Sequence, residues 1–402
     1  MKIAILTSGI LPVPAVQGGA VENLIDFYLE YNNIHCIHDI TVYSIYHPKT
    51  RNHPLRKSNV NHFYYIDVDS FLGRIKRKIY QYFYYNIGKG YYNHFIEYYY
   101  HVSFRQIKKH TYDIIIMENR PAYALKLRKH TKAKLICHLH NDLLQSNTLL
   151  AKQIYDSLDS IITVSNYISN CVRTIQQNDQ KCITVYNGID TNNFTPNYKS
   201  TIEREMIGLN KDDFVLLYSG RINQEKGIVE LIKAMSLLHE YMQIKLLIIG
   251  GSFFGNEMIE NDFITHIRKM AEPIKNNIIF TGFIPYEDMP NYLKIANIAV
   301  VPSIWNDPFP TTVLEAQAVG LPIITTMNGG IPEEVTNENA ILLQTNESFV
   351  ENLAQSILFL YQNPNKCKDM SRASIHNSKE FNKERYAKDF FKALDSLIDT
   401  KL

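Results

Sequence analysis

The sequence predicts an α/β protein of two domains, each built on a parallel sheet with helices packed on it. Its 402 residues exceed what one hydrophobic core usually serves. Two segments, 2–29 and 214–238, open alike, with an apolar strand, a glycine-containing loop and a helix with apolar residues at helical spacing. Each opening is typical of a β-α-β crossover, the connection that makes neighbouring strands parallel.

Short apolar runs alternate with helical stretches through the rest of the chain, which is the pattern of parallel strands buried on both faces. These runs predict strands at 114–117, 135–139, 161–164, 183–185, 245–249, 278–280, 298–301 and 323–325. The stretch TPNYKST (195–201) has turn chemistry and no apolar periodicity, so it marks the domain boundary. We therefore predict an N-terminal domain at 1–195, a second domain at 196–375, and a C-terminal helix within 376–402 that packs back on the first.

Composition is that of a folded globular protein, with 45% hydrophobic and 20% charged residues. The five cysteines are scattered without metal-ligand spacing, which indicates reduced thiols and a cytoplasmic location. We expect no leader peptide, and no segment approaches the roughly 20 apolar residues of a membrane span. Residues 1–195 carry 22 lysines and arginines against 14 aspartates and glutamates. This excess fits an N-terminal domain that meets anionic partners, and solvated helix faces explain it equally well.

Residues 74–100 combine a basic cluster, RIKRK, with an unusual density of tyrosines. Basic side chains attract anionic headgroups, and tyrosine favours the membrane interface because one end is apolar and the other wet. The segment predicts peripheral contact with the inner face of the plasma membrane. A pair of core helices with half-buried tyrosines is the alternative.

The run 301–335 predicts a ligand site. A strand ends at Val301, a loop follows to Pro310, a helix begins near Thr311 and ends at Gly320, and Pro332 opens another helix after the loop 328–330. Ligands of open α/β sheets bind at the carboxyl ends of strands, and a helix N-terminus offers unpaired N–H groups to phosphate or hydroxyl oxygens.

This run, DPFP, then EA, then GGIPE, resembles the nucleotide-sugar site of retaining glycosyltransferases of family 4, whose pattern is Glu-Pro-Phe-Gly, Glu-Ala and Gly-Gly-x-Pro-Glu. Further segments match in the family's order: GRINQEKG, TGFIPYEDMP, VSNYISNCV and VYNGIDTNNFTP. The N-terminal LPVPAVQGGAVENLI is similar to spore-coat-protein-like members. The resemblance implies the GT-B fold, with two facing Rossmann-like domains and a cleft between them.

The resemblance also implies an enzyme. It would transfer a sugar, with retention of anomeric configuration, from a UDP- or GDP-sugar to a hydroxyl of a glycan or lipid-linked acceptor in cell-surface polysaccharide synthesis. The implied reaction needs no metal and no cofactor, and the implied partners include no nucleic acid. The triplet Asp67-Val68-Asp69 has the sequence of the metal-binding motif of another glycosyltransferase class. We place it in a loop away from the sheet edges and predict no metal there.

By resemblance, Arg221 and Lys226 would neutralise the donor diphosphate, Glu315 would accept hydrogen bonds from the ribose, and Asp307 would hold a hydroxyl of the sugar. His140 would lie near the reacting face of the sugar; His138 points to the same side of its strand, but His140 lies nearer the strand end. The implied catalytic residues are His140, Arg221, Lys226 and Asp307. The implied donor-binding residues are Gly18, Gly19, Gly220, Arg221, Lys226, Ile284, Asp307, Phe309, Pro310, Thr311, Thr312 and Glu315.

Two positions depart from the family pattern, Asp307 for Glu and Pro310 for Gly. The first shortens the side chain and the second removes a backbone N–H, so we predict an altered sugar preference. A dehydrogenase would need G-x-G-x-x-G after the first strand, where the chain has SGILPVPAVQGGA. A non-catalytic partner subunit of a transferase complex and a sugar-nucleotide epimerase stay open as alternatives.

Overall fold

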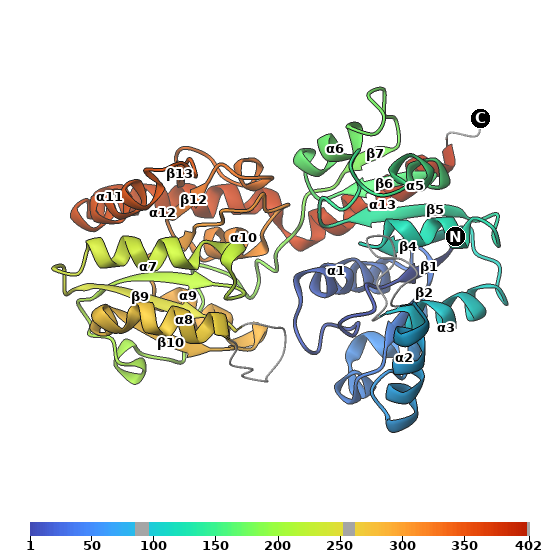
Figure 1. Cartoon of the computed structure of the whole chain (residues 1–402), viewed down its shortest axis with the longest axis horizontal. Coiled ribbons are helices and arrows are strands. Elements are labelled where there is room, and N and C mark those ends of the chain that lie inside the picture. The colour runs from blue at the N-terminus through green and yellow to red at the C-terminus, as the bar shows by residue number, and fades with distance from the viewer. Residues whose placement is uncertain (85–95, 252–261, 400–402) are drawn as a thin grey trace. The chain divides into compact units, whose positions relative to one another are not determined.

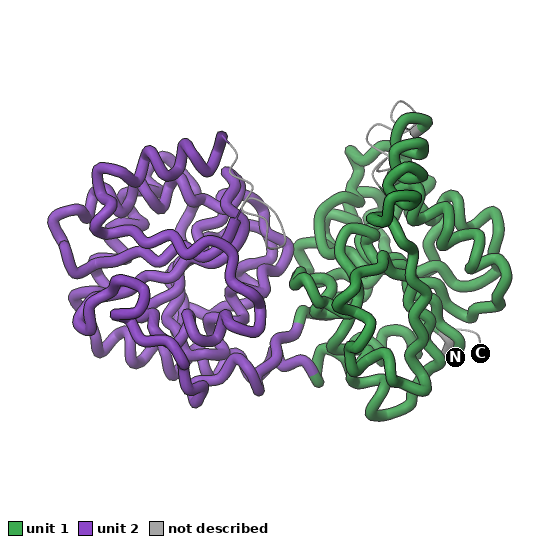
Figure 2. Tube along the Cα trace, turned by 90° about the horizontal axis from the view of Figure 1, so that it is seen from below, with its two compact units in different colours: residues 1–187, 384–402 green, residues 188–383 purple. Residues whose placement is uncertain are grey.

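The computed structural model describes residues 1–84, 96–251 and 262–399. It divides the chain into two compact units, unit 1 from residues 1–187 and 384–402 and unit 2 from 188–383 (Figure 2). Unit 2 is therefore one continuous segment, whereas unit 1 is completed by the C-terminal helix. The chain enters unit 2 at Gly188, a few residues before the boundary that we predicted from turn chemistry.

Unit 1 is built on a parallel sheet of strand order β3-β2-β1-β4-β5-β6-β7. The strands are β1 (Lys2–Leu6), β2 (Asp39–Ile45), β3 (Asn61–Ile66), β4 (Ile114–Glu118), β5 (Lys134–Leu139), β6 (Ser160–Thr163) and β7 (Cys182–Thr184). The helices are α1 (Ala20–His35), α2 (Phe71–Tyr84), α3 (Glu97–Ile107), α4 (Ala124–Leu127), α5 (Ala151–Ser157), α6 (Asn166–Arg173) and α13 (Lys383–Asp399) (Figure 1).

The core of unit 1 joins the two ends of the chain. Apolar residues of β1, β2, β4, β5 and β6 form one cluster with those of α1 and α13. Because every second residue of a strand faces the same side, the near-continuous apolar runs of the central strands fill both faces of the sheet. Helix α13 is thus a structural part of unit 1.

Unit 2 repeats the plan with a parallel sheet of order β10-β9-β8-β11-β12-β13. Its strands are β8 (Phe214–Ser219), β9 (Ile244–Ile249), β10 (Ile278–Gly282), β11 (Ile298–Val301), β12 (Ile323–Thr326) and β13 (Ala340–Leu343). Its helices are α7 (Ile228–Leu237), α8 (Asp262–Ala271), α9 (Met289–Ile295), α10 (Thr311–Val319), α11 (Phe349–Gln362) and α12 (Pro364–Ser378).

Both sheets reverse their strand order beside the first strand of the unit, at β1 and at β8. Helices α7, α8 and α11 share one apolar cluster with the sheet of unit 2, while α10 packs against α12. This doubly wound arrangement confirms the predicted α/β class with two parallel sheets. One prediction was wrong: Pro332 lies in a single 3-10 turn, Ile331–Glu333, and opens no α-helix.

Two further features concern the predicted membrane contact. Part of the segment 74–100, residues 85–95, lies outside the described residues. Among the residues that are described, no helix is both long and apolar enough to cross a bilayer.

Candidate active site

A hollow of about 170 Å³ lies in unit 2 at the carboxyl ends of β8, β9 and β10. Its lining residues come from these strand ends, from the loop after β10, and from the start of α9 and α10. They are Ser219, Gly220, Arg221, Ile249, Gly250, Gly251, Phe283, Ile284, Met289, Thr312 and Glu315. The structure thus brings together five of the residues implied for donor binding, at the edge where open α/β sheets bind ligands.

Close backbone contacts form the floor of this hollow. The N–H of Gly220 donates to the carbonyl of Ile249 at 3.0 Å, and that of Gly250 to the carbonyl of Gly282 at 2.9 Å. Gly250 has φ of +141°, and a Cβ there would lie 1.9 Å from the Gly220 oxygen. Only glycine fits at 250, because any side chain would push the ends of β8 and β9 apart.

The loop after β8 is held against the loop after β11. The carbonyl oxygen of Glu225 accepts hydrogen bonds from the N–H groups of Ile304 at 3.0 Å and Trp305 at 3.2 Å. Gly227 has φ of +70°, and a Cβ there would lie 1.8 Å from the carbonyl oxygen of Pro302. This contact fixes the position of the residue before it, Lys226.

Lys226 and Asp307 meet as an ion pair across these two loops. The Lys226 side chain is 19% exposed and that of Asp307 is 7% exposed, so the pair is largely removed from water. The Asp307 backbone is held as well, because its carbonyl accepts the N–H of Gly330 at 2.8 Å. Both residues were predicted to bind donor, and in this structure their charges neutralise each other.

Helix α10 begins directly after Pro310, with no side chain capping its first turn. The N–H of Val313, the third residue of the helix, donates to the Pro310 carbonyl at 3.1 Å, and the N–H groups before it are those that a helix leaves without an intrahelical partner. Thr311 and Thr312 lie in this turn. Phe309 is buried, and its ring centroid lies 5.8 Å from that of Phe381, which makes it a core residue.

Glu315 lies one turn into α10 and is 5% exposed. Burial raises the pKa of its carboxyl group to about 8, although a hydrogen bond with the Thr311 side chain partly offsets the effect. A carboxyl group with this pKa is mostly protonated at neutral pH. Hydroxyl donors that hydrogen-bond to it would favour its ionised form.

Glu334 is a buried carboxylate that our sequence reasoning missed. Among the described residues, neither of its carboxylate oxygens has a hydrogen-bond partner. Burial raises the pKa of Glu334 well above its usual range, the nearby Asp307 adds to the rise, and Lys226 opposes it. The one signal in the sequence was a second glutamate after GGIPE.

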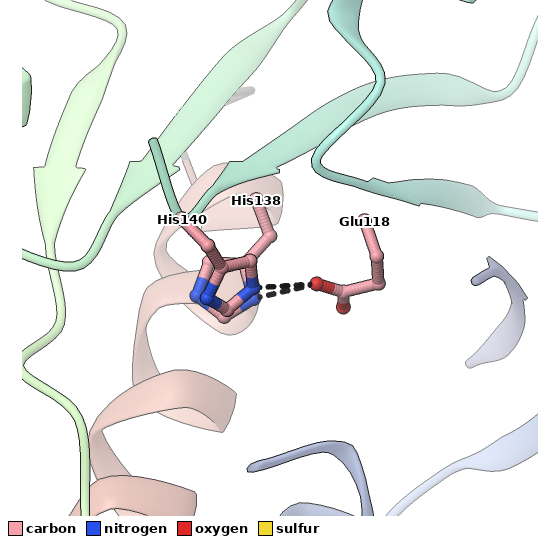
Figure 3. A group of neighbouring side chains, drawn as sticks. All are labelled: Glu118, His138 and His140. Atoms are coloured by element: carbon pink, nitrogen blue, oxygen red, sulfur yellow. Dashed lines mark hydrogen bonds and ion pairs between the residues drawn. The ribbon is translucent and has the colours of Figure 1, made fainter. Parts of the chain in front are cut away.

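In unit 1 a carboxylate and two imidazoles meet at the ends of β4 and β5 (Figure 3). The two strands pair in a register that sets Glu118 beside His138. Glu118 Oε2 lies 2.9 Å from His140 Nε2 and 3.1 Å from His138 Nδ1. The hydroxyl of Tyr28 donates to Glu118 Oε1 at 3.0 Å, and the backbone N–H of His140 donates to Asn119 Oδ1 at 3.2 Å.

The electrostatics of this cluster favour a charged Glu118 and a neutral His140. Burial alone would raise the pKa of Glu118, but contacts with His138 and His140 lower it to about 2. Burial lowers the pKa of His140 to about 4, despite the hydrogen bond to Glu118. The ligand atoms of the three side chains lie within 4.8 Å of one another, so the group has the donor set for a divalent transition metal. Glu118, which sequence reasoning also missed, orients His140.

Gly18 and Gly19 lie in the loop between β1 and α1, also in unit 1. The N–H of Gly18 donates to the carbonyl of Ala15 at 3.0 Å. Gly19 precedes α1 with φ of +104°, and a Cβ there would lie 2.3 Å from the Glu22 carboxylate. Burial raises the pKa of Glu22 to about 7, and Ser8 donates a hydrogen bond to it.

The acidic triplet Asp67-Val68-Asp69 forms a turn, and a second, larger hollow lies at the opposite edge of the sheet of unit 1. The triplet begins directly after β3, not away from the sheet edges as predicted, and Asp67 Oδ1 accepts the N–H groups of Asp69 and Ser70 in a turn. The larger hollow, about 630 Å³, is lined by Met1 and by residues 110–114 and 130–134. It adjoins the amino ends of β4 and β5, the edge opposite to the usual ligand site.

The fold is that of two doubly wound α/β units, with a hollow at the carboxyl edge of the sheet of unit 2. Two protein-family models match the chain: Glycosyltransferase Family 4 over residues 37–193 and Glycosyl transferases group 1 over 199–377. It is 29% identical over 350 residues to the putative glycosyltransferase YtcC of Bacillus subtilis (strain 168), covering 84% of this chain and 78% of that one. It is 28% identical over 349 residues to Spore coat protein SA of the same organism, covering 83% of each.

A solved structure, Anabaena Alr3699/HepE in complex with UDP-glucose, superposes with a TM-score of 0.74 at 19% identity, covering 98% of this chain and 100% of that one. The chain belongs to the glycosyltransferases that these two models describe, family 4 and group 1, and has the GT-B fold. It is therefore a transferase enzyme, as the resemblance implied.

Proposed function

We propose that the protein is a retaining glycosyltransferase that binds a nucleotide-diphosphate sugar in the hollow of unit 2. The acceptor would be a hydroxyl of a glycan or lipid-linked molecule in cell-surface polysaccharide synthesis, at the cytoplasmic face of the membrane. The observation that carries the proposal is the meeting of Arg221, Ile284, Thr312 and Glu315 around one hollow. Relatives support it: one from Escherichia coli is named a UDP-Gal:alpha-D-GlcNAc-diphosphoundecaprenol alpha-1,3-galactosyltransferase.

Each end of the donor has a proposed partner. The base would lie against the main chain at Ile284, and the Glu315 carboxylate would accept hydrogen bonds from the ribose hydroxyls. Arg221 and Lys226 would bind the diphosphate, whose negative charge grows as the glycosidic bond breaks. Binding would draw Lys226 from Asp307, which then becomes available to accept a sugar hydroxyl.

Transfer would proceed on one face of the sugar. The bond from C1 to the β-phosphate oxygen breaks, a new bond forms from C1 to the acceptor oxygen on the same face, and the departing phosphate takes the acceptor proton. Stabilisation of the diphosphate and positioning would supply the rate enhancement, without a metal. From unit 1, His140, Gly18 and Gly19 would contribute to binding donor and acceptor, and Asp307 and Pro310 would set the sugar preference.

The first test is a thermal-shift panel of UDP-, GDP-, ADP- and dTDP-sugars on wild type, Glu315→Gln and the exposed control Glu347→Gln. A ligand that binds only the folded protein raises the melting temperature. We expect one nucleotide family to stabilise wild type and the control, with a smaller shift in Glu315→Gln. No shift with any donor at millimolar concentration would overturn the proposed donor site.

Catalysis is tested with the donor so identified. We expect sugar transfer to a lipid-diphosphate acceptor. NMR should show that the new glycosidic bond has the same anomeric configuration, axial or equatorial, as the sugar–phosphate bond of the donor. The transfer rate should be the same with and without EDTA. Donor binding without transfer would favour a non-catalytic partner subunit. Conversion of the donor in the absence of acceptor would favour an epimerase.

A further inference from the structure

Helix α2 of unit 1 presents a large apolar surface to solvent. Six of its residues are exposed although their side chains are apolar or aromatic: Phe71, Leu72, Ile75, Ile79, Tyr82 and Phe83. Phe71 is 79% exposed, Leu72 is 65% exposed and Phe83 is 64% exposed. Folded proteins seldom leave contiguous apolar patches open to water unless the patch binds something.

These residues form one stripe along the helix. At about 100° per residue, all six fall within an arc of roughly 120°, which is the width of an apolar helix face. On the opposite side, a Cβ at Gly73 would lie 2.6 Å from the carbonyl oxygen of Asp67. On that side too, the Tyr80 ring lies 5.5 Å from Tyr98 and 5.1 Å from His101 of α3. The packed side of α2 is thus already used, and the apolar stripe faces outward.

Basic residues border the stripe. The segment 71–84 contains four of them and no aspartate or glutamate. Lys76 falls beyond one edge of the stripe and Lys78 and Arg74 beyond the other, and all three are exposed. Arg77 points elsewhere and pairs with Asp69 at 3.2 Å. Lysine and arginine in these positions can lay their stems along an apolar surface while their charges stay at the level of phosphates.

We propose that α2 lies in the interface of an anionic bilayer, with its apolar stripe among the acyl chains and Arg74, Lys76 and Lys78 on the lipid phosphates. This matches a basic, amphipathic interfacial helix. A second copy of the chain fits this surface less well, because a two-fold contact would place the basic residues of one α2 beside those of the other, where they repel. The surface is separate from the donor residues, so the inference does not depend on the proposed reaction.

The experiment is co-sedimentation of the full chain with phosphatidylcholine vesicles and with vesicles that also contain phosphatidylglycerol. We expect binding to the anionic vesicles alone, weakened by salt. Phe71→Ser/Ile79→Ser should abolish it, and Lys76→Gln/Lys78→Gln should weaken it about tenfold or more, since each basic residue near an anionic surface adds appreciably to binding. In Phe71→Trp, the tryptophan emission should shift to the blue when anionic vesicles are added.

Matched changes elsewhere control for hydrophobicity and charge. Leu237→Ser/Phe359→Ser removes two exposed apolar side chains from helices of unit 2, and Lys366→Gln/Lys368→Gln removes two exposed lysines with the same spacing. Both controls should bind as wild type does. Failure of wild type to bind anionic vesicles, or unchanged binding by either α2 variant, would overturn the proposal. So would concentration-dependent dimerisation without lipid that Phe71→Ser/Ile79→Ser abolishes, because the stripe would then be a contact between copies.

Discussion

Lys226 and Asp307 are the two residues whose proposed roles conflict most directly with their contacts. Each is implied to bind a different part of the donor, yet each is the other's ionic partner in a largely buried position. A single substitution of Lys226 therefore has two effects: it removes a phosphate ligand, and it leaves a buried carboxylate without its counter-charge. Loss of donor binding in that variant alone would not separate the two.

We predict that Lys226→Ala lowers the free energy of unfolding by about 1–3 kcal/mol, because it leaves the largely buried Asp307 carboxylate without its partner. Lys226→Ala/Asp307→Asn should recover most of that loss, since the asparagine carries no charge. Donor binding should remain absent in both variants. Urea unfolding measures the stability and the nucleotide-sugar thermal shift measures the binding. If the double variant binds donor normally, Lys226 acts only by neutralising Asp307.

Glu315 carries a second prediction, on pH. Its pKa is raised from 4.5 to about 8 in the folded chain, so between these values the folded state holds more protons than the unfolded state. Stability from this group therefore falls as the pH rises from about 5 to 8. Glu315→Gln does not titrate, so its stability relative to wild type should increase over that window, by up to a few kcal/mol.

The same Glu315→Gln variant should bind donor more weakly by about 10- to 100-fold, the usual worth of hydrogen bonds to a charged group. Wild-type affinity should rise with pH as Glu315 ionises, and the affinity of the variant should not. Urea unfolding and donor titration at pH 5 and pH 8 give both quantities. A stability difference between variant and wild type that is the same at pH 5 and pH 8 would contradict the raised pKa of Glu315.

At the scale of elements, α13 decides whether unit 1 is complete. The Phe390 ring is fully buried and stacks on Tyr28 of α1 with centroids 4.3 Å apart. We predict that Phe390→Ala destabilises unit 1 by about 3–5 kcal/mol, the usual cost of deleting a buried aromatic side chain. Phe359→Ala on α11, where the ring is 45% exposed, should change stability by less than about 0.5 kcal/mol. Urea unfolding reads both variants, and equal losses in the two would contradict the core role of α13.

Most strands were predicted from short apolar runs, inside the sheets and at their edges: the edge strands β7 and β10 overlap the predicted 183–185 and 278–280. Central strands such as β1, β4 and β8 were predicted because burial on both faces leaves a continuous apolar run. Strands β2 and β3 were not, because polar residues interrupt the apolar residues of DITVYSI and NHFYYI; β2 lies inside its sheet and β3 at its edge. Strand β13, at the edge of the other sheet, was missed as well.

Some residues of the candidate site were predicted from the sequence and others were not. The residues around the hollow of unit 2 were found because strand–loop–helix punctuation and the family resemblance coincide there. Glu118 was missed because its partners come from the register of β4 against β5, which no local pattern encodes. Glu334 was missed because nothing in the sequence tells that its carboxylate is buried without a hydrogen bond. Both depend on tertiary packing.

At the scale of the whole molecule, two proposed ligands fall on different units. The donor hollow is lined by unit 2 alone, whereas the proposed lipid surface belongs to α2 of unit 1. The basic excess of residues 1–195 fits the second assignment, because charge on a surface acts over about a Debye length of 10 Å. The two binding events should therefore protect different residues of the chain, which one experiment can distinguish.

We predict that hydrogen exchange on the full chain resolves them. The donor nucleotide should slow exchange at the ends of β8 and β9 and in the first turn of α10, and at about 100 times its dissociation constant it should stabilise unit 2 by roughly 3 kcal/mol. Anionic vesicles should slow exchange in α2 and leave the hollow unchanged. Exchange at Gly18 and Gly19 decides their proposed contribution: slowing by nucleotide supports it, and unchanged exchange confines donor binding to unit 2. If vesicles slow exchange throughout unit 1 to the same degree, the change is global stabilisation of the unit, and the proposal that α2 docks on the membrane is contradicted.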